Sequence, residues 1–445
     1  MWQLLQRIRS FYHRVLYSNK VYNFFLRPFD HLNVPVVRRD LLKEERKQGV
    51  VPLNKIPQVA DLANPEWRAI LDNWGGFFSM TEDIFHRKIW EFTQIIYILN
   101  KLGYLYPKNT CLAVGAGREE ILYYLANIID RVVGIDLYHG LYLGSEDNPD
   151  IVTEPQKYAP FLYPLDHLEL KQMNALEMQF PAEHFDFVFS ASSIEHFGSI
   201  RDIKASIAEM FRVLKPGGVC VITSEIKLNR LGKDIPQTRM FTPRGLADLF
   251  LQQGFSLAEE GMDLRVEDHY LHNWVKLPQE LYKYPHVILR FLRTIFTSLS
   301  LTFFKPGHAV KKGERRHFTY SPLDYSSSIN VQLNKKQLQQ SDSLELQIEL
   351  ENKGNFDWFS QGVSHRIAIG IKLLDAQGQI LDPGFAEIIL PQDVPQRGTL
   401  SFRHSLNLKL KPGRYQLLFS LKRELVVWFI EKGQQASIAP LEIFP

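Results

Sequence analysis

Short apolar runs alternate with helical stretches through the middle of the chain. The runs that predict strands are Thr110–Val114, Arg131–Asp136, Leu168–Met173, Phe185–Ser190 and Gly218–Ser224. Apolar residues recur at helical spacing over Glu119–Ile129, Ile200–Leu214 and Pro243–Gln253. This alternation is typical of an α/β domain with a parallel sheet.

A different pattern begins near Ser328. Helical periodicity ends there, and Leu344, Leu346, Ile348 and Leu350 alternate with polar residues, as in a strand with one buried face. Turn signals such as Lys411-Pro412-Gly413 separate further strand-like runs. We therefore expect residues 328–445 to form an all-β, immunoglobulin-like sandwich.

Two further regions flank the α/β domain, which we place at residues 81–306. Residues 1–80 are expected to be a helical extension, and residues 307–327, rich in Lys, Arg, Gly and Ser, an interdomain linker. The first helix is basic and amphipathic, with apolar residues at helical spacing and no acid before Asp30. Such a helix either lies against anionic lipid or packs on its own domain, and both interpretations stay open.

Composition narrows the possible functions. The 52 Lys and Arg residues nearly balance 49 Asp and Glu, leaving a net charge of +3, so the whole chain does not look like a nucleic-acid binder. Cys111 and Cys220 lie in apolar runs and suggest no disulfide framework. No uncharged apolar stretch reaches transmembrane length, and no secretion signal is evident. We expect a cytoplasmic protein, with peripheral contact to the inner membrane face left open.

A glycine turn and an acid carry the clearest chemical signal. Gly115-Ala116-Gly117 follows the first strand, where glycines let a ligand approach the backbone, and Asp136 ends the second strand, where it can accept both hydroxyls of a ribose. A dinucleotide site would also need glycine at position 120, which is Glu120, so NAD is disfavoured. Alternatively, the glycines only make a tight turn and Asp136 caps a helix.

Two more segments extend this pattern: Phe185–Ser190 with Ser193–Phe197, and Phe211–Gly218 before the fifth strand. With them, residues from about Trp90 to Phe304 resemble class I S-adenosylmethionine-dependent methyltransferases, of the type 11 kind. The resemblance implies a Rossmann-like, doubly wound, mostly parallel sheet of seven strands and S-adenosyl-L-methionine as cofactor. It implies that the cofactor is bound by Gly115, Ala116, Gly117, Asp136, Leu137, Asn174, Ala175 and Ser190.

The chain departs from that family at one position. Many members have an acid two residues before the first glycine, where this chain has Ala113. Glu119 can compensate by reaching the ammonium group of the cofactor, or it can simply interact with the dipole of the helix that it begins.

The candidate catalytic residues are His196 and Glu195. A hydroxyl acceptor needs a base, and a neutral imidazole can take a proton near pH 7. Glu195 can orient His196 or bind the acceptor; alternatively, both residues only begin a helix. His269 and His272 are close together, but no cysteine pair accompanies them, and we expect no metal site.

The C-terminal region resembles immunoglobulin-type modules appended to bacterial glycan-assembly proteins, through segments that include Trp358, Gly413 and Trp428. Each tryptophan is either a sugar-stacking platform or part of the core. We therefore expect methyl transfer to an oxygen of a carbohydrate or lipid-linked glycan, in polysaccharide biosynthesis. Small-molecule and protein acceptors stay open, as does a non-catalytic scaffold or glycan-binding protein; a dehydrogenase is disfavoured.

Overall fold

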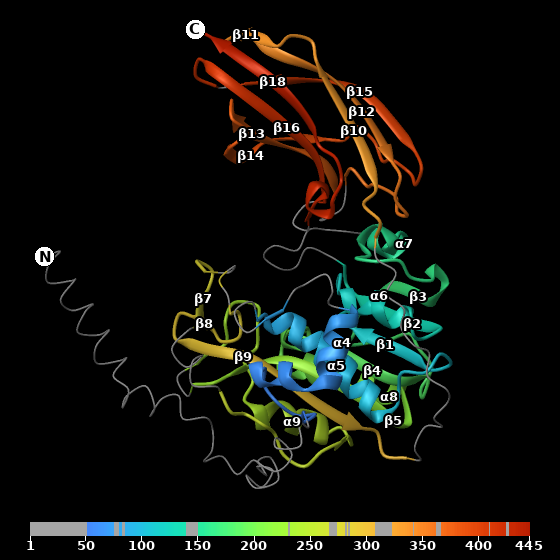
Figure 1. Cartoon of the computed structure of the whole chain (residues 1–445). Helices are drawn as coiled ribbons and strands as arrows, with labels where there is room; N and C mark the ends of the chain where they lie inside the picture. The colour runs from blue at the N-terminus through green and yellow to red at the C-terminus, as the bar shows by residue number, and fades with distance from the viewer. Residues whose placement is uncertain are drawn as a thin grey trace, which may run out of the picture. The chain divides into compact units, whose positions relative to one another are not determined.

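The computed structural model describes residues 51–74, 80–81, 85–138, 150–229, 232–266, 274–280, 283, 285–307, 323–340, 342–361, 366–408, 410–423 and 427–445. The expected N-terminal basic helix, His269, His272 and most of the expected linker lie outside these residues. The chain forms two units (Figure 1). One comprises Met1–Ser145 and Tyr163–Tyr320, and the other comprises Glu146–Leu162 and Ser321–Pro445.

A mixed sheet forms the centre of the first unit, in the order β3-β2-β1-β4-β5-β9-β8-β7, with β6 paired to β9. The five strands from β3 to β5 are parallel, and β9 runs antiparallel to β5. The sheet therefore has nine strands among the described residues, where seven were expected; the additional β7 and β8 carry too few residues for a clear alternation. The strands are β1 (Thr110–Val114), β2 (Arg131–Asp136), β3 (Leu168–Gln172), β4 (Phe185–Ala191), β5 (Leu214–Lys227), β6 (Ser256–Leu257), β7 (Val275–Lys276), β8 (Leu289–Phe291) and β9 (Thr294–Phe304).

Helices pack on this sheet. α5 lies against β4, β5 and β9, α6 against β2 and β3, α8 against β5, and α9 against β6 and β9. Every residue of β4 is buried, as expected for a strand covered on both faces. The helices are α4 (Pro65–Trp74), α5 (Arg87–Leu102), α6 (Glu120–Ala126), α8 (Ile200–Val213) and α9 (Pro243–Leu251), and short 3-10 turns lie at Val59–Ala63, Leu165–His167 and Ile194–His196.

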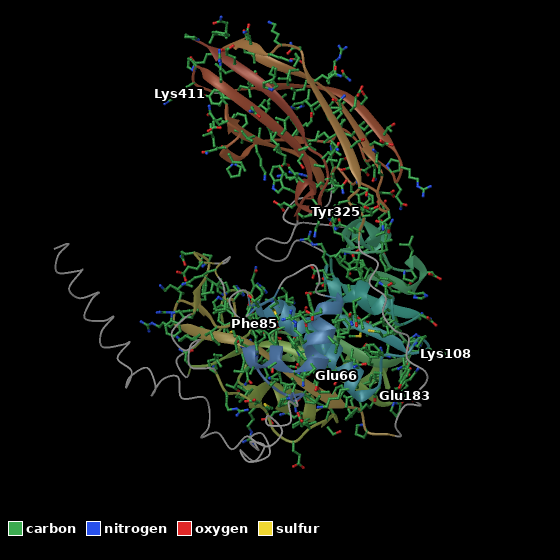
Figure 2. All side chains as sticks on the ribbon, in the orientation of Figure 1. Glu66, Phe85, Lys108, Glu183, Tyr325 and Lys411 are labelled. Carbon is green, nitrogen blue, oxygen red and sulfur yellow. The ribbon has the colours of Figure 1, made fainter. Side chains whose placement is uncertain are left out.

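Local sequence fixes the ends of these helices. A capping box begins α8, because Ser199 accepts from the N–H of Asp202 while the Asp202 carboxylate accepts from Ser199. The buried Phe85 lies just before α5 (Figure 2), and His86 caps the helix by accepting from the N–H of Lys88. Gly103, in the left-handed region, follows its last residue. Among the described residues, no helix has the length and apolar character needed to cross a bilayer.

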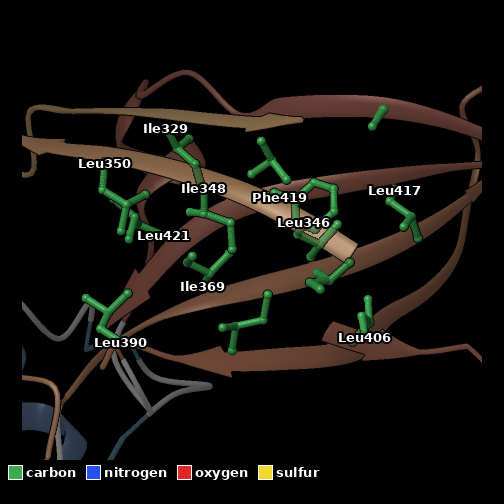
Figure 3. Close-up of a cluster of buried hydrophobic side chains, with 14 of the residues drawn as sticks. Ile329, Leu346, Ile348, Leu350, Ile369, Leu390, Leu406, Leu417, Phe419 and Leu421 are labelled. Atoms are coloured by element: carbon green, nitrogen blue, oxygen red, sulfur yellow. The ribbon is translucent and has the colours of Figure 1, made fainter. Parts of the chain in front are cut away.

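The second unit contains two β-sheets that share one apolar core (Figure 3). The smaller antiparallel sheet has the order β10-β12-β15, and the larger has the order β11-β18-β16-β13-β14, with β17 paired to β16. The strands are β10 (Ser327–Leu333), β11 (Gln337–Gln339), β12 (Ser343–Asn352), β13 (Ile367–Asp375), β14 (Ile380–Ile389), β15 (Thr399–Asn407), β16 (Gly413–Arg423), β17 (Val427–Trp428) and β18 (Ser437–Phe444). The alternating Leu344, Leu346, Ile348 and Leu350 all point into this core.

The two tryptophans singled out in the sequence differ in environment. Trp358 is fully buried in the core and packs edge-on against Phe429. Trp428 is half-buried and lies directly against Gly370, where a Cβ would come within 2.3 Å of the indole. Lys372 places its ammonium 4.4 Å from the Trp428 ring centroid.

One segment of the second unit comes from between β2 and β3. It contains α7 (Asp150–Thr153) and a 3-10 turn, Pro155–Tyr158. The buried guanidinium of Arg423 donates to the carbonyl of Ala159 at 2.9 Å, and Lys157 lies over the ring of Phe359. The units therefore differ from the continuous domains expected from the sequence, because a loop of the α/β region folds with the β-rich unit.

Candidate functional site

The glycine turn has a backbone that favours glycine. Gly115 and Gly117 have φ of +69° and +47°, in the left-handed region. A Cβ on Gly115 would lie 2.4 Å from the Cβ of Ser193, whereas a Cβ on Gly117 would meet none of the described residues within 4 Å. The N–H groups of Gly115 and Ala116 both donate to the carbonyl of Ile135, which ties the turn to β2. Open space therefore lies beside Gly117, at the carboxyl edge of the sheet.

Asp136 faces this turn from the end of β2. One carboxylate oxygen accepts from the N–H of Gly117 at 3.0 Å, and the other accepts from the N–H of Tyr138 at 3.2 Å. A carboxylate has about four lone-pair sites. Among the described residues two of these sites on Asp136 are occupied, and the other two can accept the hydroxyls of a ribose.

The next strand end supplies the neighbouring surface. Asn174 follows β3, and its side chain accepts from the N–H of Leu176 in a local turn, with Ala175 buried beside it. Leu137, directly after Asp136, is 38% exposed although it is apolar. An exposed leucine between Asp136 and the β3 turn offers an apolar contact for a flat base.

Ser190 and Ser193 lie near the end of β4. Ser193 donates to the carbonyl of Gly115 at 2.7 Å and so fixes β4 against the glycine turn. The hydroxyl of Ser190 is buried and has no hydrogen-bond partner in the described structure. A buried polar atom without a partner beside the turn is a position at which a ligand can supply one.

Glu195 is buried just beyond β4. Its two oxygens accept from the hydroxyl of Ser224 at 2.8 Å and from the N–H of Glu225 at 3.2 Å. Burial, together with the nearby Glu225 carboxylate, raises the pKa of Glu195 to about 7, and His196 opposes the shift. These hydrogen bonds hold Glu195 against β5, and neither of them involves His196. If Glu195 orients His196, one of its two predicted roles, it does so through the attraction between their charges.

His196 is partly exposed in the same turn. Its Nδ1 lies 3.0 Å from the carbonyl oxygen of Gln237 and 3.4 Å from the Thr238 hydroxyl. A carbonyl can only accept, so Nδ1 carries the hydrogen when the ring is neutral. Nε2 then has the lone pair and is the basic nitrogen.

Glu119, at the start of α6, is paired with a residue that the sequence analysis missed. The ammonium of Lys88 lies 2.9 Å from its carboxylate, and the side chain makes no helix-capping hydrogen bond. Burial raises the pKa of Glu119 to about 7, although Lys88 opposes the shift. Lys88 belongs to a charged cluster at the start of α5 that also contains Arg87 and Glu91.

That cluster links α5 to the central strands. Glu91 is fully buried and accepts from Arg87 at 3.0 Å, from Ser192 at 2.8 Å and from Ser298. Arg87 also donates to Glu225 at 2.6 Å. Three charges within the first five residues of a largely apolar helix were the signal in the sequence, and their partners lie on distant strands.

The arrangement fits S-adenosyl-L-methionine. Its adenosine requires a hydroxyl acceptor beside an apolar surface, which Asp136 and Leu137 supply. Its amino-acid end requires room beside the turn, which the open space at Gly117 supplies. Ser190 adds the unpaired polar atom in the same region.

Known proteins agree with this assignment. Residues 112–222 match the family described as a methyltransferase domain, a span that contains every predicted site residue. No curated protein matches the chain at a significant level.

Solved structures with a similar fold include the following three. The 4+2 cyclase SpnF is 13% identical, with a TM-score of 0.36 over 57% of this chain and 98% of that chain. A putative sarcosine dimethylglycine methyltransferase from Galdieria sulphuraria is 15% identical, with a TM-score of 0.35 over 54% and 98%. A methyltransferase from Methanosarcina mazei is 19% identical, with a TM-score of 0.33 over 47% and 98%.

The identification of the enzyme and its cofactor rests on the family match together with the residues of the site. The chain is therefore an S-adenosylmethionine-dependent methyltransferase, and S-adenosyl-L-methionine is the cofactor of its α/β domain.

Proposed function

We propose that this enzyme methylates an oxygen of a carbohydrate or lipid-linked glycan. The observation that carries the proposal is the pair Glu195 and His196, which places a buried carboxylate and a partly exposed imidazole at the end of β4. An alcohol is a weak nucleophile until it loses its proton, so a base beside the cofactor suits an oxygen acceptor.

In this proposal His196 takes the proton. The cofactor supplies a methyl group on a positively charged sulfur, which needs an aligned nucleophile more than further activation. Because the Gln237 carbonyl holds the hydrogen on Nδ1, Nε2 keeps the lone pair that would accept the proton of the acceptor hydroxyl. Glu195 in its ionised form stabilises the imidazolium that results, since the two groups attract each other.

The substrate class rests on the parts of the chain outside the α/β domain. We interpret the β-rich unit as an immunoglobulin-like module that binds a glycan, a protein or the catalytic domain. Trp428 is its candidate sugar contact, because its half-buried indole lies against Gly370 at the sheet surface; a sugar would have to displace the ammonium groups of Lys372 and Lys422, which lie over the ring. The basic N-terminal segment is interpreted as a peripheral contact with the cytoplasmic face of the inner membrane, where lipid-linked glycans are assembled.

Transfer of an isotopically labelled methyl group tests the proposal. The enzyme is incubated with the cofactor carrying a trideuterated methyl group and, separately, with lipid-linked glycan, polysaccharide, protein and small alcohols. We expect the label on a sugar oxygen, detected by mass spectrometry after hydrolysis. His196→Asn should lower kcat by about 100-fold or more and leave cofactor affinity unchanged. Label on protein or small alcohols, with none on sugar, would refute the glycan assignment.

A further inference from the structure

One cation from α5 reaches the joint between the glycine turn and β4. The ammonium of Lys88 lies 2.9 Å from a carboxylate oxygen of Glu119, 2.8 Å from the carbonyl oxygen of Ala191 and 3.5 Å from Glu91. Its side chain is 30% exposed, and that of Glu119 is 17% exposed. Both charges are thus partly open to a ligand, although most of each side chain is covered.

The other charges of this cluster pair with groups on the strands of the sheet. Glu91 is completely buried and is held by Arg87, Ser192 and Ser298, and Arg87 also reaches Glu225. These contacts fix the first turn of α5 against the sheet. Lys88 and Glu119 are therefore the pair of opposite charges in this cluster that lies next to the glycine turn and keeps some exposure.

The cofactor ends in an α-amino acid, whose ammonium and carboxylate groups are adjacent. A zwitterion is bound best by two opposite charges set side by side, because each of its groups then makes a charge-assisted hydrogen bond. The chain has Ala113 where an acid was expected, so β1 supplies no charge for the ammonium group. The nearest carboxylate beyond the turn is that of Glu119, at the start of α6.

We propose that Lys88 and Glu119 form the subsite for the amino-acid end of the cofactor. Lys88 binds the carboxylate, and Glu119 binds the ammonium group in place of the acid missing at Ala113. The ion pair between them holds both side chains ready when no cofactor is bound, and it opens so that each takes its partner on the ligand. This subsite does not depend on which acceptor the enzyme methylates.

A purely structural ion pair is the competing explanation, and two ligands distinguish it from a subsite. S-adenosylhomocysteine carries the amino-acid end, whereas 5′-methylthioadenosine shares the adenosine and thioether but lacks that end. Calorimetric titration of the full chain gives the ratio of the two dissociation constants. We expect Lys88→Met to weaken S-adenosylhomocysteine binding about 10-fold to 100-fold and to change methylthioadenosine binding less than about twofold.

Two more variants supply a second test and a control. Glu119→Gln, which preserves shape, should reduce the preference for S-adenosylhomocysteine by a similar factor. Lys101→Met, at the other end of α5, should leave both affinities unchanged. The proposal is overturned if Lys88→Met and Glu119→Gln keep the wild-type ratio of the two dissociation constants. It is also overturned if either variant has the wild-type unfolding temperature but loses affinity for both ligands equally.

Discussion

The carboxylate of Asp136 accepts a hydrogen bond from the backbone N–H of Gly117 at 3.0 Å, so the ends of β1 and β2 are joined at the cofactor site. The contact depends on the turn conformation, because Gly117 has a φ of +47°. A carboxylate held in this way would need no rearrangement to accept a ribose, which would reduce the entropy lost on binding.

Alanine at the two turn glycines should have unequal effects. Both substitutions place a side chain in the left-handed region, at a cost of about 1–2 kcal/mol. At Gly115 the new Cβ would also lie 2.4 Å from Ser193, whereas at Gly117 no described residue lies within 4 Å of it. Gly115→Ala should therefore lower the free energy of unfolding by at least about 1 kcal/mol more than Gly117→Ala. Chemical denaturation measures both, and equal losses would contradict the geometry.

Glu195→Gln should change how stability depends on pH. The pKa of Glu195 is about 7 in the folded protein and near 4.5 when unfolded, so the folded state holds the extra proton between these values. The contribution of Glu195 to the free energy of unfolding of the wild type therefore falls as pH rises from 4.5 to 7. The glutamine of the variant cannot ionise. The free energy of unfolding of the variant, relative to that of the wild type, should therefore rise by about 2–3 kcal/mol between pH 5 and pH 8. A constant difference across this range would show that Glu195 titrates normally.

His286 should make the protein sensitive to acid. Its ring stacks on His86 with centroids 4.4 Å apart, and burial lowers the pKa of His286 to about 3 and that of His86 to about 4. The unfolded chain binds these protons near pH 6.5, so stability is lost as pH falls below that value.

The matching variant is His286→Phe, which keeps a ring in the stack. Between pH 7 and pH 5, wild type should lose about 2 kcal/mol more stability than the variant. Chemical denaturation at the two pH values measures the difference. Parallel losses in both proteins would mean that His286 is protonated in the folded state.

Arg423 should hold the segment from between β2 and β3 on the β-rich unit. Its guanidinium donates to the carbonyl of Ala159 from a buried position, and a hydrogen bond from a charged donor contributes about 1.5–3 kcal/mol. In Arg423→Met, hydrogen exchange of the amides in residues 151–161 should become faster. Arg403→Met, at an exposed residue, serves as the control. Unchanged exchange in Arg423→Met would show that other contacts hold the segment.

The α/β elements could be predicted because their signals are local. The expected helix over residues 200–214 is observed as Ile200–Val213, and the expected strand Thr110–Val114 is observed unchanged. Burial on both faces makes such strands continuous apolar runs, and the Ser199 cap marks the start of the helix. The glycine turn and Asp136 could be identified for the same reason, since each directly follows a strand.

The charged cluster on α5 could not be predicted from the chain. Arg87 pairs with Glu225, which lies 138 residues away, and Glu91 with Ser298, which lies 207 residues away. In the sequence these residues only interrupt an apolar helix, as exposed residues would. The attachment of residues 150–162 to the β-rich unit is equally non-local, because Arg423, which donates to Ala159, lies far along the chain.

Cofactor binding is the most direct test of the central assignment. Calorimetric titration with S-adenosylhomocysteine is made on the wild type, on Asp136→Ala and on Asp130→Ala, which alters an acid just before the opposite end of β2. We predict micromolar binding by the wild type and by Asp130→Ala, and a loss of about 100-fold or more in Asp136→Ala, since two hydrogen bonds to a charged acceptor are removed. Absence of binding to the wild type, or undiminished binding to Asp136→Ala, would contradict the site described for this methyltransferase.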